Sequence, residues 1–171
     1  EERPDGDGGS LSHQFGVEPA PRLPRPGPGN WAELLTMVGV GPLEQRLREA
    51  LPPNVELLGW VARPRLAELF AGAGGFIHVG EEDFGISMVE ALAAGTPVLA
   101  ADGGGARDIV RPERDGVLIS NPADPARIRA GVRELAGRAW DADALRESAQ
   151  RFSEERFRAR FLEVLHAHGA R

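Results

Sequence analysis

The sequence predicts an α/β fold, with a Rossmann-like, doubly wound and mostly parallel sheet. Two observations support this class. Short apolar runs of four to seven residues recur along the chain, and segments with helical spacing of apolar residues separate them. Glycine and proline bound most of these runs, as expected where strands and helices alternate in βαβ units. Sheets of this kind bind ligands at the carboxyl ends of their strands.

The chain of 171 residues divides by composition into two parts. Residues 1–30 are acidic and Gly-rich at first and dense in Pro and Gly afterwards, which is typical of loop or partly disordered chain. Residues 31–171 carry the alternating pattern and end in an amphipathic helix. We therefore expect an atypical N-terminal segment, 1–30, followed by one Rossmann-like domain over 31–171.

Two strand–helix units come first in the predicted domain. Residues 34–40 predict a buried strand, and Pro42 suits the first position of a helix whose leucines 43, 47 and 51 repeat every four residues. Residues 55–60 predict the second strand, and Pro64 opens the helix that follows it.

The second half of the domain repeats the same alternation. Strands are predicted at 76–79, 97–101 and 116–119, and helices at 86–94, from Asp124-Pro125 onward and from about Ser153 to the end. Gly95 ends the first of these helices, and Asp124 is a residue type that caps helix N-termini.

Composition excludes several function classes. Twenty basic residues stand against 26 acidic ones, and the resulting net charge of −6 argues against a nucleic-acid binder. All the basic residues are Arg and there is no Cys, which excludes lysine-based catalysis, disulfides and thiolate metal sites. No apolar run is long enough to cross a membrane and no signal peptide is visible. The expected location is the cytoplasm, with peripheral membrane association left open.

The segment most informative about chemistry is 80–105, which begins where the strand 76–79 ends. Glu81, Glu82 and Asp83 precede Gly85, and a helix then starts at Ile86. A Gly at a helix start lets an anion approach free backbone N–H groups, so Gly85 and Ile86 could hold a diphosphate.

Glu90 lies one to two turns into the same helix and, with Glu82, brackets its start. A nucleotide-sugar fits this layout, because ionised carboxylates accept hydrogen bonds from sugar and ribose hydroxyls. Two plainer interpretations remain open. The three acids could form a solvated loop that complements the helix dipole, and Glu90 could simply face water. His78, within an apolar strand, is expected to be a core or site-wall residue rather than a base.

Several motifs in order over 34–165 resemble the donor-binding half of GT-B glycosyltransferases, and especially the large retaining family with the E-x7-E signature. Glu82 and Glu90 have that spacing. The other matching motifs are Glu82-Asp83-Phe84-Gly85, Gly95-Thr96-Pro97-Val98, Gly104-Gly105, Gly39-x-Gly41-Pro42, Asn54-Val55, Leu58-Gly59-Trp60-Val61 and Asp115-Gly116-Val117-Leu118.

The resemblance implies roles for individual residues. Glu82 would contact the donor sugar and help stabilise the reacting centre, so it is the implied catalytic residue. Asp83, Phe84, Gly85 and Ile86 would line the sugar and diphosphate site, Glu90 would hold the ribose and Val61 would meet the base. The resemblance implies no metal and no cofactor, and the EEDFG variant is similar to mannosyltransferases, which suggests GDP-mannose as donor. Sugar transfer would proceed with retention.

Two departures from the family pattern favour an alternative. The Arg and Lys that usually clamp the diphosphate have only Arg22 and Gly27 near their places. The replacement of the usual Glu after Gly104-Gly105 by Asp108 is a milder change and does not bear on the alternative. The chain also has room for only one of the two GT-B domains, so an N-terminal acceptor domain or partner chain is missing. The alternative is a non-catalytic or degenerate interaction module, with a GT-B-like epimerase or phosphorylase as a third option.

Overall fold

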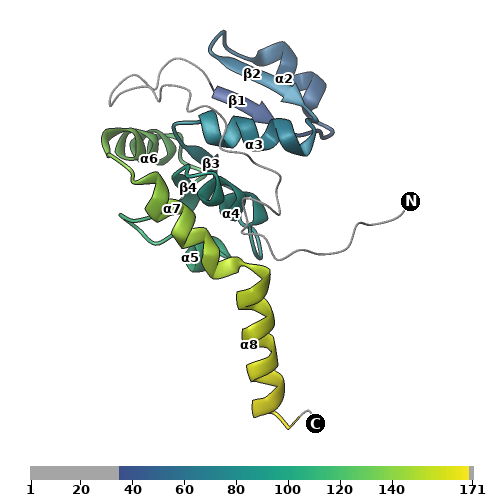
Figure 1. Ribbon diagram of the computed structural model, residues 1–171. Helices are drawn as coiled ribbons and strands as arrows, with labels where there is room; N and C mark the ends of the chain where they lie inside the picture. The colour runs from purple at the N-terminus through teal and green to yellow at the C-terminus, as the bar shows by residue number, and fades with distance from the viewer. Residues whose placement is uncertain (1–34, 170–171) are drawn as a thin grey trace, which may run out of the picture.

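The computed structural model describes residues 35–169. Within them the strands are β1 (Leu35–Val38), β2 (Val55–Gly59), β3 (Phe76–His78), β4 (Val98–Ala101) and β5 (Gly116–Ile119). The helices are α2 (Glu44–Ala50), α3 (Arg63–Gly72), α4 (Ile86–Ala93), α5 (Ala106–Ile109), α6 (Pro125–Gly137), α7 (Ala142–Ala149), the 3₁₀ turn η1 (Gln150–Phe152) and α8 (Glu154–Ala167). Figure 1 shows their arrangement.

The strands confirm the predicted α/β class, because every strand pair is parallel. The pairs fall into two sheets in the described residues, one of order β1-β2 and one of order β3-β4-β5. A single continuous sheet was the simplest prediction from the sequence. Within 35–169, however, no strand pairs β1 to β3, so the two sheets stay separate.

Helices cover both faces of the three-stranded sheet, as the doubly wound prediction requires. Val98 and Ala100 of β4 point to one face, where they join a core with Met88 and Leu92 of α4 and with α7. Leu99 points to the other face, where it packs with residues of β5 and α6. Both faces of β4 are therefore buried, which explains why this strand reads as a continuous apolar run.

Several predicted helix signals are confirmed at atomic detail. The Asp124 carboxylate accepts a hydrogen bond from the amide of Ala126, and Ser153 accepts one from the amide of Arg156. Gly95, with a φ of 81°, ends α4.

The boundaries of two helices differ from the prediction. The helix expected from Pro42 begins at Glu44, and α3 begins one residue before Pro64. Three short elements were not predicted, namely α5, α7 and η1. Two of them, α5 and η1, have four and three residues, too few for a clear apolar period.

Helix α8 extends away from the body of the molecule (Figure 1). None of its residues is buried, and its stripe of apolar side chains includes the exposed Phe157, Phe161 and Val164. No helix in the described part of the chain is long and apolar enough to span a membrane. The proposed boundary at residue 30, together with Arg22 and Gly27, lies outside the described residues.

Candidate functional site

The acidic loop, defined here as residues 81–85, connects β3 to α4 at the carboxyl end of the three-stranded sheet. This is the edge at which parallel α/β sheets bind ligands. The loop and the first residues of α4 line an open depression of about 450 Å³, and its lining residues are Glu81, Glu82, Asp83, Phe84, Gly85, Ile86 and Ser87. Five of the seven predicted site residues therefore line one depression.

A second loop, the glycine loop of residues 103–105, supports the acidic loop by direct backbone contact. The Gly105 amide donates a 2.8 Å hydrogen bond to the carbonyl of Glu82. A Cβ on Gly104 would lie 2.3 Å from that carbonyl oxygen, and a Cβ on Gly105 would lie 2.1 Å from the carbonyl oxygen of Phe84. Only glycine allows the two loops to pack so closely, which explains the paired glycines that follow β4.

The start of α4 provides free backbone donors. Gly85 is the N-cap, with a φ of 97°, a left-handed conformation that side chains rarely adopt. No acceptor for the amides of Ile86 and Ser87 occurs in the part of the chain that the structure describes, as is usual in the first turn of a helix. These amides and the helix dipole favour an anion at the mouth of the depression.

Glu82 lies at the edge of this depression, with about half of its side chain exposed. Its Oε1 atom is 3.5 Å from Nε2 of His78, the last residue of β3. Glu81 turns toward the glycine loop, because its Cδ lies 3.6 Å from the position of a Cβ on Gly103. The two acids therefore have different basic neighbours: Glu82 lies beside His78, and the charge of Glu81 interacts with that of Arg107.

Glu90 lies on α4 outside the lining of the depression, and its side chain is partly buried. Burial raises the pKa of Glu90, and the positive charge of Arg63 opposes this effect. Arg63 is the first residue of α3, which packs against α4. The open interpretation in which Glu90 faces only water does not describe this environment.

Val61 is half-buried in the connection between β2 and α3, two residues before Arg63. Like Glu90, it lies outside the lining of the depression. The interaction between Arg63 and Glu90 shows that the start of α3 and the middle of α4 are neighbours. The predicted roles of Val61 with a base and of Glu90 with a ribose stay predictions.

Phe84 connects the acidic loop to the C-terminal part of the chain. Its ring meets the ring of Phe152 in η1 edge to face, with centroids 5.8 Å apart. Such a pair contributes roughly 0.5–1.5 kcal/mol beyond the area that it buries. About half of Phe84 stays exposed, so its other face is free to contact a ligand.

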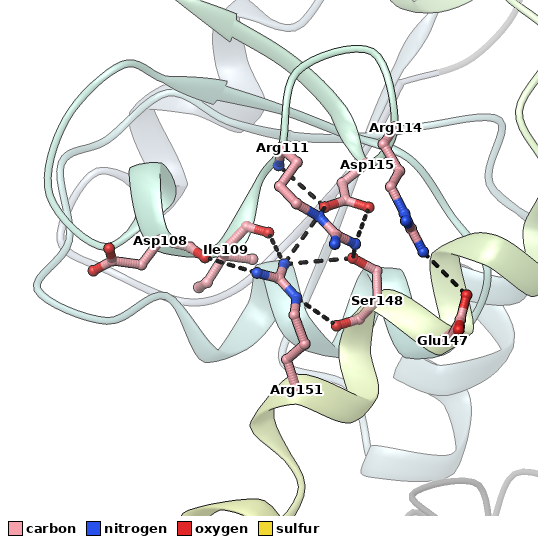
Figure 2. Close-up of polar contacts among 8 residues, drawn as sticks. All are labelled: Asp108, Ile109, Arg111, Arg114, Asp115, Glu147, Ser148 and Arg151. Carbon is pink, nitrogen blue, oxygen red and sulfur yellow. Dashed lines mark hydrogen bonds and ion pairs between the residues drawn. The ribbon is translucent and has the colours of Figure 1, made fainter.

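A buried cluster around Asp115 holds the segment that follows the glycine loop (Figure 2). The Asp115 side chain is fully buried and accepts hydrogen bonds from Nε and the backbone amide of Arg111, at 2.7 and 3.1 Å. Arg151 lies 3.5 Å from the same carboxylate and donates to the carbonyls of Asp108 and Ile109. The cluster thereby joins α5, which follows Gly105, to α7 and η1.

The ionisation of Asp115 reflects two opposing effects. Burial alone would raise the pKa of this carboxyl, but hydrogen bonds from Arg111 and Ser148 outweigh burial and hold the pKa below its usual value. Arg111 also donates to the Ser148 hydroxyl. The ion pair is therefore satisfied on all sides, and the landmark Asp115-Gly116-Val117-Leu118 has a structural role in this chain.

Residues 35–169 contain no group of three or more His, Asp or Glu side chains arranged to hold a metal ion. The arrangement instead combines backbone donors for an anion with carboxylates for hydroxyl groups. Sequence reasoning missed Arg63 and Phe152 as neighbours of the site. The signal for Arg63 was its place just before the helix-opening Pro64, in the segment that follows β2.

Comparison with known proteins gives consistent matches. A family model described as "Glycosyl transferases group 1" matches residues 13–138. A GDP-mannose-dependent alpha-mannosyltransferase of Mycobacterium tuberculosis is 42% identical over 86 residues, which are 50% of this chain and 22% of the relative. The enzyme of the same description from Mycolicibacterium smegmatis is 37% identical over 102 residues, which are 59% of this chain and 27% of the relative. The chain thus spans about a quarter of the length of these relatives.

Solved structures share the fold. The lipopolysaccharide outer core galactosyltransferase WaaB, in its apo form, superposes with a TM-score of 0.67 at 18% identity, over 79% of this chain and 41% of that protein. Anabaena Alr3699/HepE in complex with UDP and glucose superposes with a TM-score of 0.60 at 24% identity, over 92% of this chain and 51% of that protein. The described domain is therefore one Rossmann-like half of a GT-B architecture.

Proposed function

Because the chain belongs to the glycosyl transferases of group 1, we propose that its described domain binds the nucleoside diphosphate sugar that serves as glycosyl donor. One observation carries the proposal. The amides of Ile86 and Ser87, which have no acceptor within residues 35–169, open onto the same depression as the carboxylate of Glu82. Backbone amides are the donors that a diphosphate needs, and a carboxylate is an acceptor for the hydroxyls of a sugar.

Each site residue has a proposed role. The diphosphate would bind at Gly85 and Ile86, and Asp83 and Phe84 would border the sugar. Glu82 would accept a hydrogen bond from the donor sugar and help stabilise positive charge that develops there in the transition state. Glu90 would accept from the ribose, and Val61 would contact the base. No metal or cofactor is needed, since the helix start itself stabilises the leaving diphosphate.

Mannose is the proposed sugar and GDP-mannose the proposed donor. Support comes from the two mycobacterial relatives, which are described as GDP-mannose-dependent alpha-mannosyltransferases, and from the Glu82-Asp83-Phe84-Gly85 sequence of the acidic loop. Retention of configuration follows from the family resemblance alone. Because the chain spans about a quarter of these relatives, we propose that transfer needs an acceptor-binding domain or partner chain beside it.

Isothermal titration calorimetry of the full 171-residue chain with GDP, UDP and ADP tests donor binding. We expect measurable binding of at least one nucleotide, weakened by Glu90→Ala. A matched control is Glu134→Ala, because Glu134 lies on α6, which covers the opposite face of the sheet, and forms an ion pair with the nearby Arg138. Absence of binding by all three nucleotides at millimolar concentration, with the chain folded, would contradict the proposal.

A second function, that of a non-catalytic interaction module, is favoured by one observation. Three acids and no basic side chain line the depression in the part of the chain described, so its walls offer backbone amides and the Ser87 hydroxyl to a diphosphate but no charged donor. Charge-assisted hydrogen bonds are each worth about 1.5–3 kcal/mol, and a site without them would bind donors weakly. Sugar transfer by the chain together with a supplied N-terminal domain would eliminate this function.

A further inference from the structure

The imidazole of His78 is the feature of the site that the roles above leave unused. Its Nε2 atom is the one buried side-chain polar atom without a hydrogen bond within residues 35–169. A buried polar atom left unpaired costs roughly 1–3 kcal/mol, so such an atom calls for an explanation. The nearest charged group is the Glu82 carboxylate, with Oε1 at 3.5 Å.

The position of the ring is set by its surroundings. His78 and Phe76 are two residues apart in β3, so they lie on the same face of the strand, and their rings stack at a centroid distance of 6.2 Å. Phe76 in turn packs edge to face against Phe70, which links the stacked rings of His78 and Phe76 to the core. The Nε2 edge of the ring lies next to the backbone of Gly80, because a Cβ on Gly80 would be in ordinary van der Waals contact with Nε2 at 3.6 Å. The imidazole is therefore held in place before any ligand binds.

Glu82, by contrast, is held only loosely. About half of its side chain is exposed, and no hydrogen bond to its carboxylate is found in the part of the chain described. The separation of 3.5 Å exceeds a good N–H···O bond, which is near 2.9 Å. Such contacts in unliganded sites often shorten when the substrate is bound.

We propose that His78 is a positioning residue for Glu82, and that its Nε2–H donates a hydrogen bond to the Glu82 carboxylate when a nucleotide-sugar occupies the site. The bond fixes the free carboxylate oxygen toward the sugar hydroxyls. This inference rests on the proposed function, because it assigns His78 to the same donor site. The bond also requires a proton on Nε2 of His78.

Two variants separate the hydrogen bond from the packing of the ring. His78→Phe keeps an aromatic ring that stacks on Phe76 but removes the donor. His78→Gln places an amide N–H near the former Nε2 position and restores the donor without the ring. Thermal unfolding followed by circular dichroism identifies variants that remain folded.

Affinities for GDP-mannose and for GDP, measured by calorimetry on each folded variant, test the proposal. We expect His78→Phe to lose about tenfold in the ratio of GDP-mannose to GDP affinity, with GDP binding itself unchanged, and His78→Gln to recover most of that ratio. A purely structural role would change both ligands equally. An unchanged ratio in His78→Phe would overturn the proposal.

A second readout needs no ligand and keeps the two proposals distinguishable. The ¹⁵N chemical shifts of the His78 ring in the labelled chain, at a pH where the imidazole is neutral, report which nitrogen carries the proton. The proposal requires a protonated Nε2 whose shift changes in Glu82→Gln, and a proton on Nδ1 alone, or a shift unaffected by Glu82→Gln, would overturn it. If that change is seen and no nucleotide binds, donor binding fails and the contact between His78 and Glu82 stands.

Discussion

Substitution of Gly105 by Ala gives the most direct test of how the site is built. The added Cβ would lie 2.1 Å from the carbonyl oxygen of Phe84, where real Cβ contacts are almost never below 3.0 Å. The acidic loop must therefore retreat by about 0.9 Å, the difference between these two distances. The retreat also stretches the 2.8 Å hydrogen bond between the Gly105 amide and the Glu82 carbonyl.

The expected loss follows from these two effects. Overpacking costs roughly 1–3 kcal/mol, and a lost hydrogen bond costs roughly 0.5–1.5 kcal/mol. We expect the free energy of unfolding of Gly105→Ala to fall by about 2–4 kcal/mol, as measured by urea denaturation. GDP affinity should also fall, since the displaced loop carries Glu82 and Gly85.

Gly103→Ala is the matched control for this experiment. Its Cβ would meet the Glu81 side chain at 3.6 Å, an ordinary van der Waals distance, and its φ lies outside the left-handed region. We expect a change of no more than about 0.5 kcal/mol. If Gly105→Ala were as stable as Gly103→Ala and bound GDP equally well, close packing of the two loops would not position the site.

Three further predictions concern ionisable and aromatic groups. Asp115→Asn should lower the free energy of unfolding by about 2–3 kcal/mol in urea denaturation, less than for a fully buried pair because Arg111 and Arg151 reach solvent. The folded-state pKa of Asp115 is lowered, so its contribution to the free energy of unfolding is present above about pH 4 and is lost as pH falls through the folded-state pKa. Asp115→Asn should therefore reduce the fall of the free energy of unfolding at acid pH. Burial raises the pKa of Glu90, so its ionisation opposes folding as pH rises. Glu90→Gln should therefore raise the Tm at pH 7 while weakening GDP binding about tenfold. A lower Tm together with weaker GDP binding would contradict this assignment. Phe152→Ala should cost about 1 kcal/mol in GDP-mannose affinity, because Phe152 supports Phe84 at the proposed sugar site, as calorimetry can check.

Local sequence signals predicted the elements that make up the fold. Apolar runs gave the five strands, and the cap at Asp124 and the glycine at Gly95 marked helix ends that the structure confirms. The same signals failed for α5 and η1, because one or two turns contain too few residues to show a period. The separation into two sheets was also not predicted, since strand neighbours depend on contacts far apart in the sequence.

The candidate site was predictable in its contiguous part only. Residues 82–86 are adjacent in the chain, so the motif itself placed them together. The support of the loop by Gly104 and Gly105, the influence of Arg63 on Glu90 and the approach of Phe152 join segments separated by 20 residues or more. Such approaches follow from the tertiary packing of helices and loops, which periodicity along one chain does not encode.

Within the described strands, β1 and β3 each have a side with no neighbouring strand, and this affects how the chain behaves in solution. Each strand hydrogen-bonds to a neighbour on one side only within residues 35–169, and Leu35 and Val38 of β1 are about 40% exposed. Open edges with apolar side chains invite other copies to add their own strands. Preparations at high concentration should therefore form β-rich aggregates, and purification at low concentration should keep the chain monomeric.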